Sequence, residues 1–349
     1  MKHSFPRISL AVSLFLVVTS IPAQEAVTAS PQIKVLVIDG QNNHKWQSMT
    51  PFMKTQMEKT GFITVDVTTT PPKAPGKPRR RKNAKGAQQP PKETAEQITA
   101  RKNAAAKIAK AWEAWRPNFS DYQVIVSNYN GELWPEEVRE DYTAFVKSGG
   151  GVLIVHAANN AFPQWKEFNE MIGLGWRNAK FGKRVYLNAD GKPVLVNAHD
   201  GSCKCAAEKN HGCLGAGHGP QHEYQITIRD TEHPITKGMP PVWMHTKDEL
   251  YHGQRGPAAN MQILASAHSV TNAPGRRGTG VYEPMLWVIP YGKGKVVTNV
   301  MGHENGKALQ CVGFITLMNR SIEWLATGTV TIPVPKTFPT AEKSSSAIE

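Results

Sequence analysis

The chain has 349 residues and a formal net charge of +13 at pH 7, a balance that first suggests a nucleic-acid-binding protein. The charge is concentrated, because residues 73–110 contain twelve Lys or Arg against two Glu, and Lys2 and Arg7 stand at the start of the chain. The remainder is close to neutral. The basicity therefore belongs to one segment, which we interpret as a solvated insertion, and nucleic acid is not an expected partner.

The first residues have the pattern of a secretory signal peptide: a basic start followed by the apolar run ISLAVSLFLVVTSI. This run is too short for a convincing membrane span, and no later segment has the ~20 apolar residues that a spanning helix needs. We expect residues 1–23 to be removed, with cleavage near Ala23 or Ala26. The mature protein is then periplasmic or secreted and has no membrane span.

Apolar runs and helical patterns alternate along the first half of the mature chain. Strands are predicted at residues 32–40, 62–68, 122–128 and 151–157. Helices are predicted from Thr50-Pro51 to Gly61 and over residues 93–115, 135–147 and 161–172. Alternation of this kind is typical of a parallel sheet with helices on both faces.

The pattern changes after residue 172 to short strands joined by turns. The sequence predicts a hairpin over 184–197, further strands in HEYQITIRD, MQILASA and MLWVIPYGKGKVVTNVMG, and a closing helix over 307–326. The predicted organisation is one α/β domain over 31–330. It carries a basic, low-complexity and helical insertion at about 71–115 and a loose tail at 331–349.

The cysteines favour disulfide bonds over a metal site. Four are present, and an even number in an exported protein indicates one or two disulfides, whose pairing the sequence leaves open: Cys203, Cys205, Cys213 and Cys311. The segment CKCAAEKNHGC also resembles a metal-binding loop, but its C-x-C spacing is not the usual spacing of structural zinc.

Histidines and carboxylates gather at the predicted strand ends. His44 follows the first strand, His156 ends the strand GVLIVHA, and His303 follows KVVTNVMG. Because the carboxyl ends of parallel strands share one edge of a sheet, these three histidines are expected to converge. The candidate catalytic residues are His156, His303, Asp248 and Glu249, and the candidate substrate-binding residues are Asn43, His44, Trp46, Tyr251, Trp287 and Glu304.

Such a cluster can act in three ways, which the sequence does not separate. It can exchange protons near neutral pH, bind a divalent metal such as zinc, or hydrogen-bond sugar hydroxyls beside an aromatic ring. Asp248 and Glu249 are neighbours on a strand and face opposite ways, so they do not form a hydrolytic pair by themselves. No G-x-G-x-x-G, Walker or G-x-S-x-G motif is present, which disfavours nucleotide-dependent chemistry and serine hydrolysis.

Several segments together resemble the ThuA-like family, named for trehalose utilisation: GGGVLIVHAA, EHPITKGMP, KDELY, EPMLWVIPYGKGKVV and MGHENGKALQCVGFITLMNRSIEWLATGTVTIPVP. The last is especially similar to exported bacterial members. The resemblance implies a class I glutamine amidotransferase-like fold, a flavodoxin-like three-layer sandwich with a mostly parallel sheet. In that fold His156 stands where an amidotransferase carries its nucleophilic cysteine, so glutaminase activity is disfavoured.

The resemblance also implies a sugar-processing enzyme that acts on (3-keto-)glycosides or disaccharides. Its chemistry would be isomerisation, elimination or hydrolysis, carried by histidine acid/base or metal-assisted steps. The alternative is a non-catalytic exported carbohydrate-binding protein. The expected partner is a small carbohydrate, and a homo-oligomer is left open.

Overall fold

The computed structural model describes residues 1, 32–77, 82–83, 86–87, 93–200, 214–271, 278–304 and 306–348. Contacts divide the chain into two units, Met1–Pro31 and Gln32–Glu349, and the described helices and strands belong to the second. Most of the predicted signal peptide lies outside the described residues.

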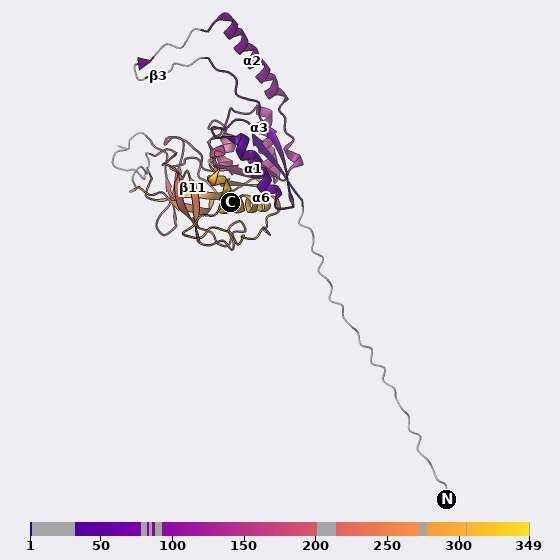
Figure 1. The fold of residues 1–349 in the computed structure, drawn as a ribbon, viewed down its shortest axis with the longest axis vertical. Coiled ribbons are helices and arrows are strands. Elements are labelled where there is room, and N and C mark those ends of the chain that lie inside the picture. Colours follow the sequence, from indigo (N-terminus) through magenta and orange to yellow (C-terminus); the bar gives the residue numbers. More distant parts are fainter. Residues whose placement is uncertain are drawn as a thin grey trace. The chain divides into compact units, whose positions relative to one another are not determined.

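One large mixed sheet organises the second unit (Figure 1). Its eleven strands are β1 (Ile33–Asp39), β2 (Ile63–Thr69), β5 (Val124–Ser127), β6 (Gly151–Val155), β7 (Arg184–Leu187), β8 (Pro193–Val196), β10 (His222–Ile228), β11 (Val242–Asp248), β13 (Gln262–His268), β14 (Tyr282–Tyr291) and β15 (Gly294–Asn299). Two small pairs lie outside it: β3 (Lys82–Asn83) with β4 (Gly86–Ala87), and β9 (Gly217–His218) with β12 (Tyr251–His252).

The helices are α1 (Trp46–Glu58), α2 (Ala95–Ala114), α3 (Glu136–Ser148), α4 (Lys166–Ile172), α5 (Lys307–Gln310) and α6 (Val312–Thr327). The helix predicted to begin at Thr50-Pro51 begins four residues earlier, at Trp46. Thr50 is buried and accepts a hydrogen bond from the Asn128 side chain (3.1 Å), so its hydroxyl is not a helix cap. Pro51 is exposed, and the helix carries it on its solvent side, where the missing backbone hydrogen bond costs least.

The strand order is β11-β10-β13-β14-β15-β6-β5-β1-β2, with β7 and β8 joined at β14. Only the run β15-β6-β5-β1-β2 is parallel, and the remaining pairings are antiparallel. The fold is therefore α/β as predicted, but the mostly parallel sheet is not confirmed. Connection length explains two of these pairings: a parallel pair needs a crossover of a dozen or more residues, whereas the short turns at residues 188–192 and 292–293 can join only antiparallel neighbours, β7 with β8 and β14 with β15.

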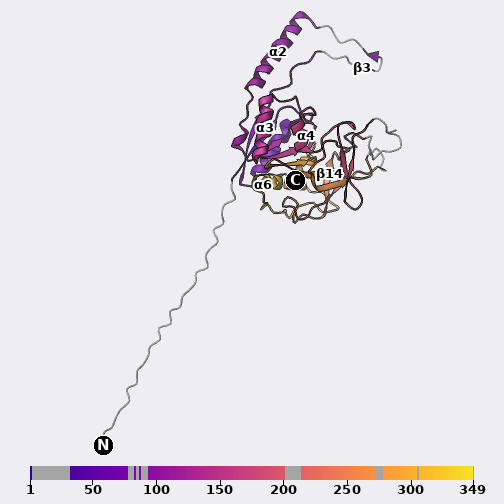
Figure 2. The ribbon, with the colours of Figure 1, turned by 180° about the vertical axis from the view of Figure 1, so that it is seen from behind.

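Helices cover both faces of the parallel run (Figure 1, Figure 2). Alternate side chains of a strand face opposite sides, so Val35 and Val37 of β1 pack with α1 and α6, while Leu36 and Ile38 pack with α3 and α4. All four side chains are buried. This packing fixes the direction of β1, β5, β6 and β15 and thus the edge at which their carboxyl ends meet.

The predicted basic segment contains a well-capped helix. Thr94 accepts a hydrogen bond from the Gln97 backbone (3.2 Å), and the Gln97 side chain accepts one from the Thr94 backbone (2.9 Å), which is a capping box at the start of α2. No residue of α2 is buried. The helix is therefore stabilised mainly by its own sequence, and Trp112 near its end packs against the core.

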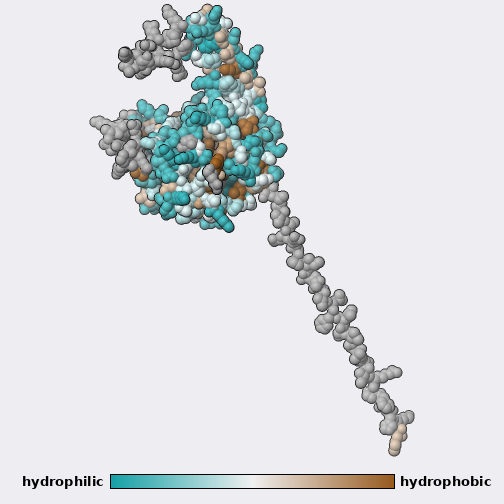
Figure 3. Space-filling view, in the orientation of Figure 1, coloured by the Kyte–Doolittle hydropathy of each residue, from teal (hydrophilic) through white to brown (hydrophobic). Residues whose placement is uncertain are grey.

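The face drawn in Figure 3 is largely hydrophilic, and the hydrophobic residues on it form small, separate areas. Among the described residues, no helix has the length and apolar character needed to cross a membrane.

The C-terminal tail is not loose. The Glu323 carboxylate on α6 accepts hydrogen bonds from the backbone of Thr331 (2.7 Å) and Ile332 (3.0 Å), and Phe338 packs on the Trp243 ring. Sequence composition predicted a detached end because proline and polar residues dominate it. Backbone hydrogen bonding and one aromatic anchor attach it to the domain instead.

This arrangement predicts the effect of Glu323→Ala. The substitution leaves two backbone N–H groups without their acceptor, so the free energy of unfolding should fall by about 2 kcal/mol. Urea unfolding followed by circular dichroism measures it, with Glu342→Ala, an exposed residue of the same tail, as the control. Equal stability of the two variants would contradict the attachment.

Candidate functional site

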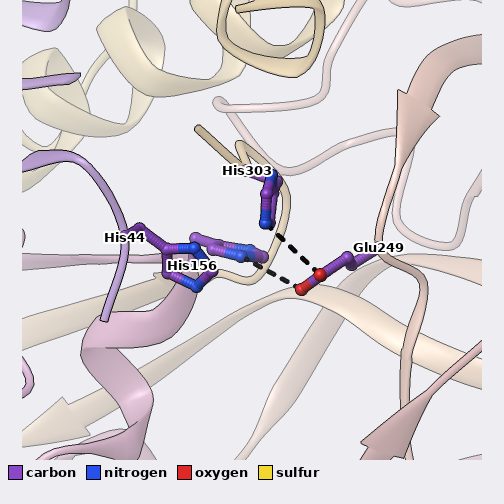
Figure 4. A group of neighbouring side chains, drawn as sticks. All are labelled: His44, His156, Glu249 and His303. Carbon is purple, nitrogen blue, oxygen red and sulfur yellow. Dashed lines mark ion pairs between the residues drawn. The ribbon is translucent and has the colours of Figure 1, made fainter. Parts of the chain in front are cut away.

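Three strand ends of the parallel run bring three histidines together. His44 lies in the loop after β1, His156 directly follows β6, and His303 follows β15. The ring centroids are 4.9 Å apart for His44 and His156, 4.5 Å for His44 and His303, and 5.5 Å for His156 and His303. Glu249 enters the same place from the end of β11 (Figure 4). We call His44, His156, Glu249 and His303 the four-residue cluster.

His156 occupies a sharp turn in the backbone. Its φ is +46°, in the left-handed region that a non-glycine residue seldom adopts, and β6 ends there in a 3₁₀ turn (His156–Asn160). The side chain is fully buried. The turn points the imidazole across the ends of the strands instead of along the sheet.

The hydrogen bonds of His156 fix which ring nitrogen carries the proton. Nδ1 lies 2.8 Å from the carbonyl oxygen of Val300, and a carbonyl only accepts, so Nδ1–H donates. Nε2 therefore presents a lone pair, toward the Tyr251 hydroxyl at 3.1 Å and Glu249 Oε2 at 3.7 Å. Burial lowers the pKa of His156 to about 3, so the imidazole is neutral at physiological pH.

The Glu249 carboxylate lies among imidazoles. Its Oε1 is 3.3 Å from His303 Nε2 and 3.5 Å from His218 Nε2, while Oε2 faces His156. Burial raises the pKa of Glu249, and the nearby histidines oppose that rise. Glu249 supplies the one carboxyl group of the four-residue cluster.

His303 and His44 are held by neighbouring polar side chains. The Gln221 amide nitrogen lies 3.2 Å from His303 Nδ1, and the Asn43 amide nitrogen lies 3.2 Å from His44 Nε2. Glu304 lies 3.7 Å from His44 Nδ1 and also accepts a hydrogen bond from the backbone of Lys45. Burial lowers the pKa of both His44 and His303.

Asp248 lies beneath the four-residue cluster and not within it. Its carboxylate is fully buried and accepts hydrogen bonds from His245 Nε2 (2.8 Å) and from the backbone of Gly302 (2.8 Å) and His303 (3.2 Å). Burial would raise its pKa, but the hydrogen bond and charge of His245 hold the pKa at about 2. Asp248 therefore positions the turn that carries His303, while its neighbour Glu249, just beyond the end of β11, faces the histidines.

The remaining predicted residues differ in whether they contact the four-residue cluster. Asn43, Tyr251 and Glu304 contact the four-residue cluster. Trp46, half-buried at the start of α1, lines a neighbouring cavity of about 370 Å³ together with Asn43. Trp287 is fully buried in the core, where its Nε1 donates to the carbonyl of Ile172 (2.8 Å), so it is not a surface for substrate.

Two aromatic residues near the cluster were not among the predicted site residues. The Trp176 ring lies 4.7 Å from Tyr251 and 5.7 Å from His218, and His218 stacks on Tyr251 at 6.1 Å. Trp176 is half-buried, and the His218 side chain is 35% exposed. Trp176 lies in an irregular segment and His218 in the two-residue strand β9, and neither is long enough in regular structure for periodicity to indicate what its side chain faces.

Of the four cysteines that were predicted to form disulfides, the structure describes only Cys311. Cys203, Cys205, Cys213 and His211 lie outside the described residues. Cys311 is buried and carries a free thiol beside His245.

Residues 80–325 match the family model described as ThuA, trehalose utilisation. The chain belongs to the ThuA family. His156, Glu249 and His303 lie within the matched range, and His44 precedes it.

Two solved structures of ThuA-like proteins are similar to this chain. The protein from Parabacteroides merdae ATCC 43184 is 35% identical, with a TM-score of 0.71, over 90% of this chain and 97% of that one. The protein from Bacteroides uniformis ATCC 8492 is 17% identical, with a TM-score of 0.50, over 93% of this chain and all of that one, and it shows a shared fold alone. No curated protein matches the sequence.

The buried carboxylate beneath the cluster gives a testable pH dependence. The folded-state pKa of Asp248, about 2, lies below its ordinary 3.8, so ionised Asp248 stabilises the fold above pH 3.8 and this contribution is lost as the pH falls through 2. Wild-type unfolding free energy should therefore drop by about 2 kcal/mol between pH 4 and pH 2 through this group.

Asp248→Asn should cost about 3 kcal/mol at pH 7, because it leaves buried His245 without its anionic partner. The same substitution should remove most of the fall below pH 4. Urea unfolding across this pH range measures both effects, and Asp190→Asn, on an exposed turn, is the control. An acid dependence that is unchanged in Asp248→Asn would show that other carboxylates cause it.

Proposed function

We propose that this ThuA protein is an enzyme that processes a glycoside at the four-residue cluster, with 3-keto-glycosides or disaccharides as the substrate class. One observation carries the proposal: three imidazoles and one carboxylate, contributed by four separate strand ends, meet at a single edge of the sheet. Convergence of titratable groups from distant parts of a chain is the usual form of an active site. Membership of a family described by trehalose utilisation supports a carbohydrate-related function.

The aromatic side chains beside the cluster suit a sugar ring. Tyr251 presents its hydroxyl toward His156, and Trp176 lies against the Tyr251 ring. An aromatic face can pack on the apolar face of a pyranose while the cluster holds its oxygen atoms. Glycoside binding is therefore proposed between Trp176 and the four-residue cluster.

The chemistry of a 3-keto-glycoside fits such a site. The ketone acidifies the hydrogen on carbon 2, so a base can remove that proton, and the glycosidic oxygen can leave carbon 1 when a proton returns to it. Neutral, buried His156 presents the lone pair of Nε2 to the site, so it can accept a hydrogen bond or a proton from the substrate. His218, at the exposed rim of the site, is the proposed proton carrier.

The elbow at His156 supports a class I glutamine amidotransferase-like, flavodoxin-like fold as the origin of the site. A left-handed residue directly after a buried strand is the backbone arrangement that presents a nucleophile in such folds. The residue is a histidine here, so we propose that glutamine hydrolysis is absent. We also propose that residues 1–23 are a signal peptide and that the mature protein is exported.

The enzyme proposal is tested with His218→Ala. On a 3-keto-glycoside, kcat should fall by at least about 100-fold, because a general acid–base group typically contributes that much. His268→Ala, an exposed histidine on β13, should retain wild-type turnover. Liquid chromatography of the sugar products measures both variants.

The same samples separate an enzyme from a carbohydrate-binding protein. Isothermal titration with the unoxidised and the 3-keto sugar is run beside the turnover assay. Saturable binding without product, in wild-type protein supplied with divalent metals, would favour the binding protein and overturn the enzyme proposal.

Export is tested independently of catalysis. Expression of the full chain in a bacterium should place a shortened protein in the periplasmic or culture fraction, with an amino terminus close to residue 24 or 27. N-terminal sequencing checks this. A full-length chain retained in the cytoplasmic fraction would contradict the signal peptide.

A further inference from the structure

We infer that the four-residue cluster binds one divalent transition-metal ion through His44, His156, His303 and Glu249. One ligand atom from each of these residues lies within 4.8 Å of the ligand atoms of the other three. Donors on one ion stand roughly 3–4 Å apart when metal–ligand bonds are about 2.0–2.2 Å long. The measured pairs His303–Glu249 (3.3 Å) and His156–Glu249 (3.7 Å) already have this spacing.

The orientation of the atoms favours a cation over mutual hydrogen bonding. His156 Nδ1 is committed as a donor to Val300, so Nε2 offers a lone pair in the direction of the Tyr251 hydroxyl and the Glu249 carboxylate. Two acceptor atoms that face each other repel unless a positive charge lies between them. A metal ion satisfies the imidazole and the carboxylate together.

The surrounding contacts are those that hold metal ligands in place. A ligating histidine typically donates its second ring nitrogen to a carbonyl or carboxylate, which fixes the tautomer, and the His156–Val300 pair has this form. Asp248 fixes the backbone of Gly302 and His303, the turn that carries the third imidazole. The strand ends therefore present the ligands on a rigid support.

The ligand types indicate the class of metal. Three imidazoles and one carboxylate suit Zn²⁺, Fe²⁺, Co²⁺ or Ni²⁺, whereas Mg²⁺ and Ca²⁺ prefer oxygen ligands. An ion held by four protein ligands can accept a further oxygen. The Tyr251 hydroxyl, 3.1 Å from His156 Nε2, lies where it can donate to an oxygen bound there.

This inference rests on the proposed site and deepens the proposed function, because such an ion would polarise a ketone or hydroxyl oxygen of the substrate. Metal binding is nevertheless measured without substrate. A protein that binds the metal but turns over no sugar overturns the enzyme proposal alone. Full turnover by a protein that fails to bind Zn²⁺ and Co²⁺ overturns the metal inference alone.

The first experiment is metal analysis of the purified full chain by inductively coupled plasma mass spectrometry. We expect close to one transition-metal ion per chain, lost on dialysis against a chelator and regained with Zn²⁺. Titration of the metal-free protein with Co²⁺ should give visible absorption bands that saturate at one equivalent. Failure to bind Zn²⁺ and Co²⁺ at one equivalent would overturn the inference.

The second experiment assigns the ligands. His156→Ala and Glu249→Gln should each weaken Co²⁺ binding by at least about 100-fold, the upper range seen when even supporting contacts of a metal site are removed. His268→Ala should bind as wild type does. Circular dichroism confirms that each variant is folded, and Glu249→Asp, which keeps the carboxylate, should recover part of the affinity.

The two ligand variants also test whether the metal binds elsewhere in the chain. Wild-type affinity in a folded His156→Ala or Glu249→Gln protein would place the metal outside the four-residue cluster and overturn the assignment. Loss of the ion in both variants, with retention in His268→Ala, supports it. The chelator experiment keeps the inference testable if a variant fails to fold.

Discussion

The site depends on the buried carboxylate of Asp248. It joins the end of β11 to the turn after β15 by accepting hydrogen bonds from the backbone of Gly302 and His303, and His245 beneath it balances its charge. Burial would lower the pKa of His245, but Cys311 and Asp248 raise it to about 10, so the pair remains ionised over the physiological range. A charged pair of this kind adds little to stability by itself, but its geometry is demanding. It sets the relative position of Glu249 and His303, which come from opposite halves of the sheet.

The mixed sheet explains why one site contains residues from both the parallel and the antiparallel half of the sheet. The parallel run supplies the three histidines, because its strands end at a common edge. The antiparallel half supplies Glu249 and Tyr251, because β11 and the turn after it reach back to that edge. A wholly parallel sheet would supply the histidines alone, without the carboxylate that lies between them.

Much of this could be predicted from the sequence, and particular residues show where prediction stops. His44, His156 and His303 were predictable as a group, since strand ends of a parallel sheet share an edge. Trp176 and His218 were not, because an irregular segment and a two-residue strand have no periodicity that relates them to a distant strand. Trp287 was expected at the substrate on composition alone, and the sequence does not show that its indole is enclosed by the core.

The roles of Asp248 and Glu249 show the same limit of prediction from the sequence. Alternation along a strand predicted that Asp248 and Glu249 point apart; in the structure β11 ends at Asp248, and the two carboxylates have different partners. It did not say which of them faces the histidines, because that depends on the neighbours of β11 across the sheet. Pairing between strands far apart in sequence decides it.

The attached tail has a consequence for how the protein behaves in concentrated solution. β11 is the outermost strand of the antiparallel half, and an outermost strand exposes backbone groups that can pair with a second molecule. The tail occupies part of that margin, since the Met244 backbone donates to the carbonyl of Thr340 (2.7 Å) and Gln225 donates to that of Ala341 (2.9 Å). The last residues thus shield the sheet against strand-to-strand aggregation.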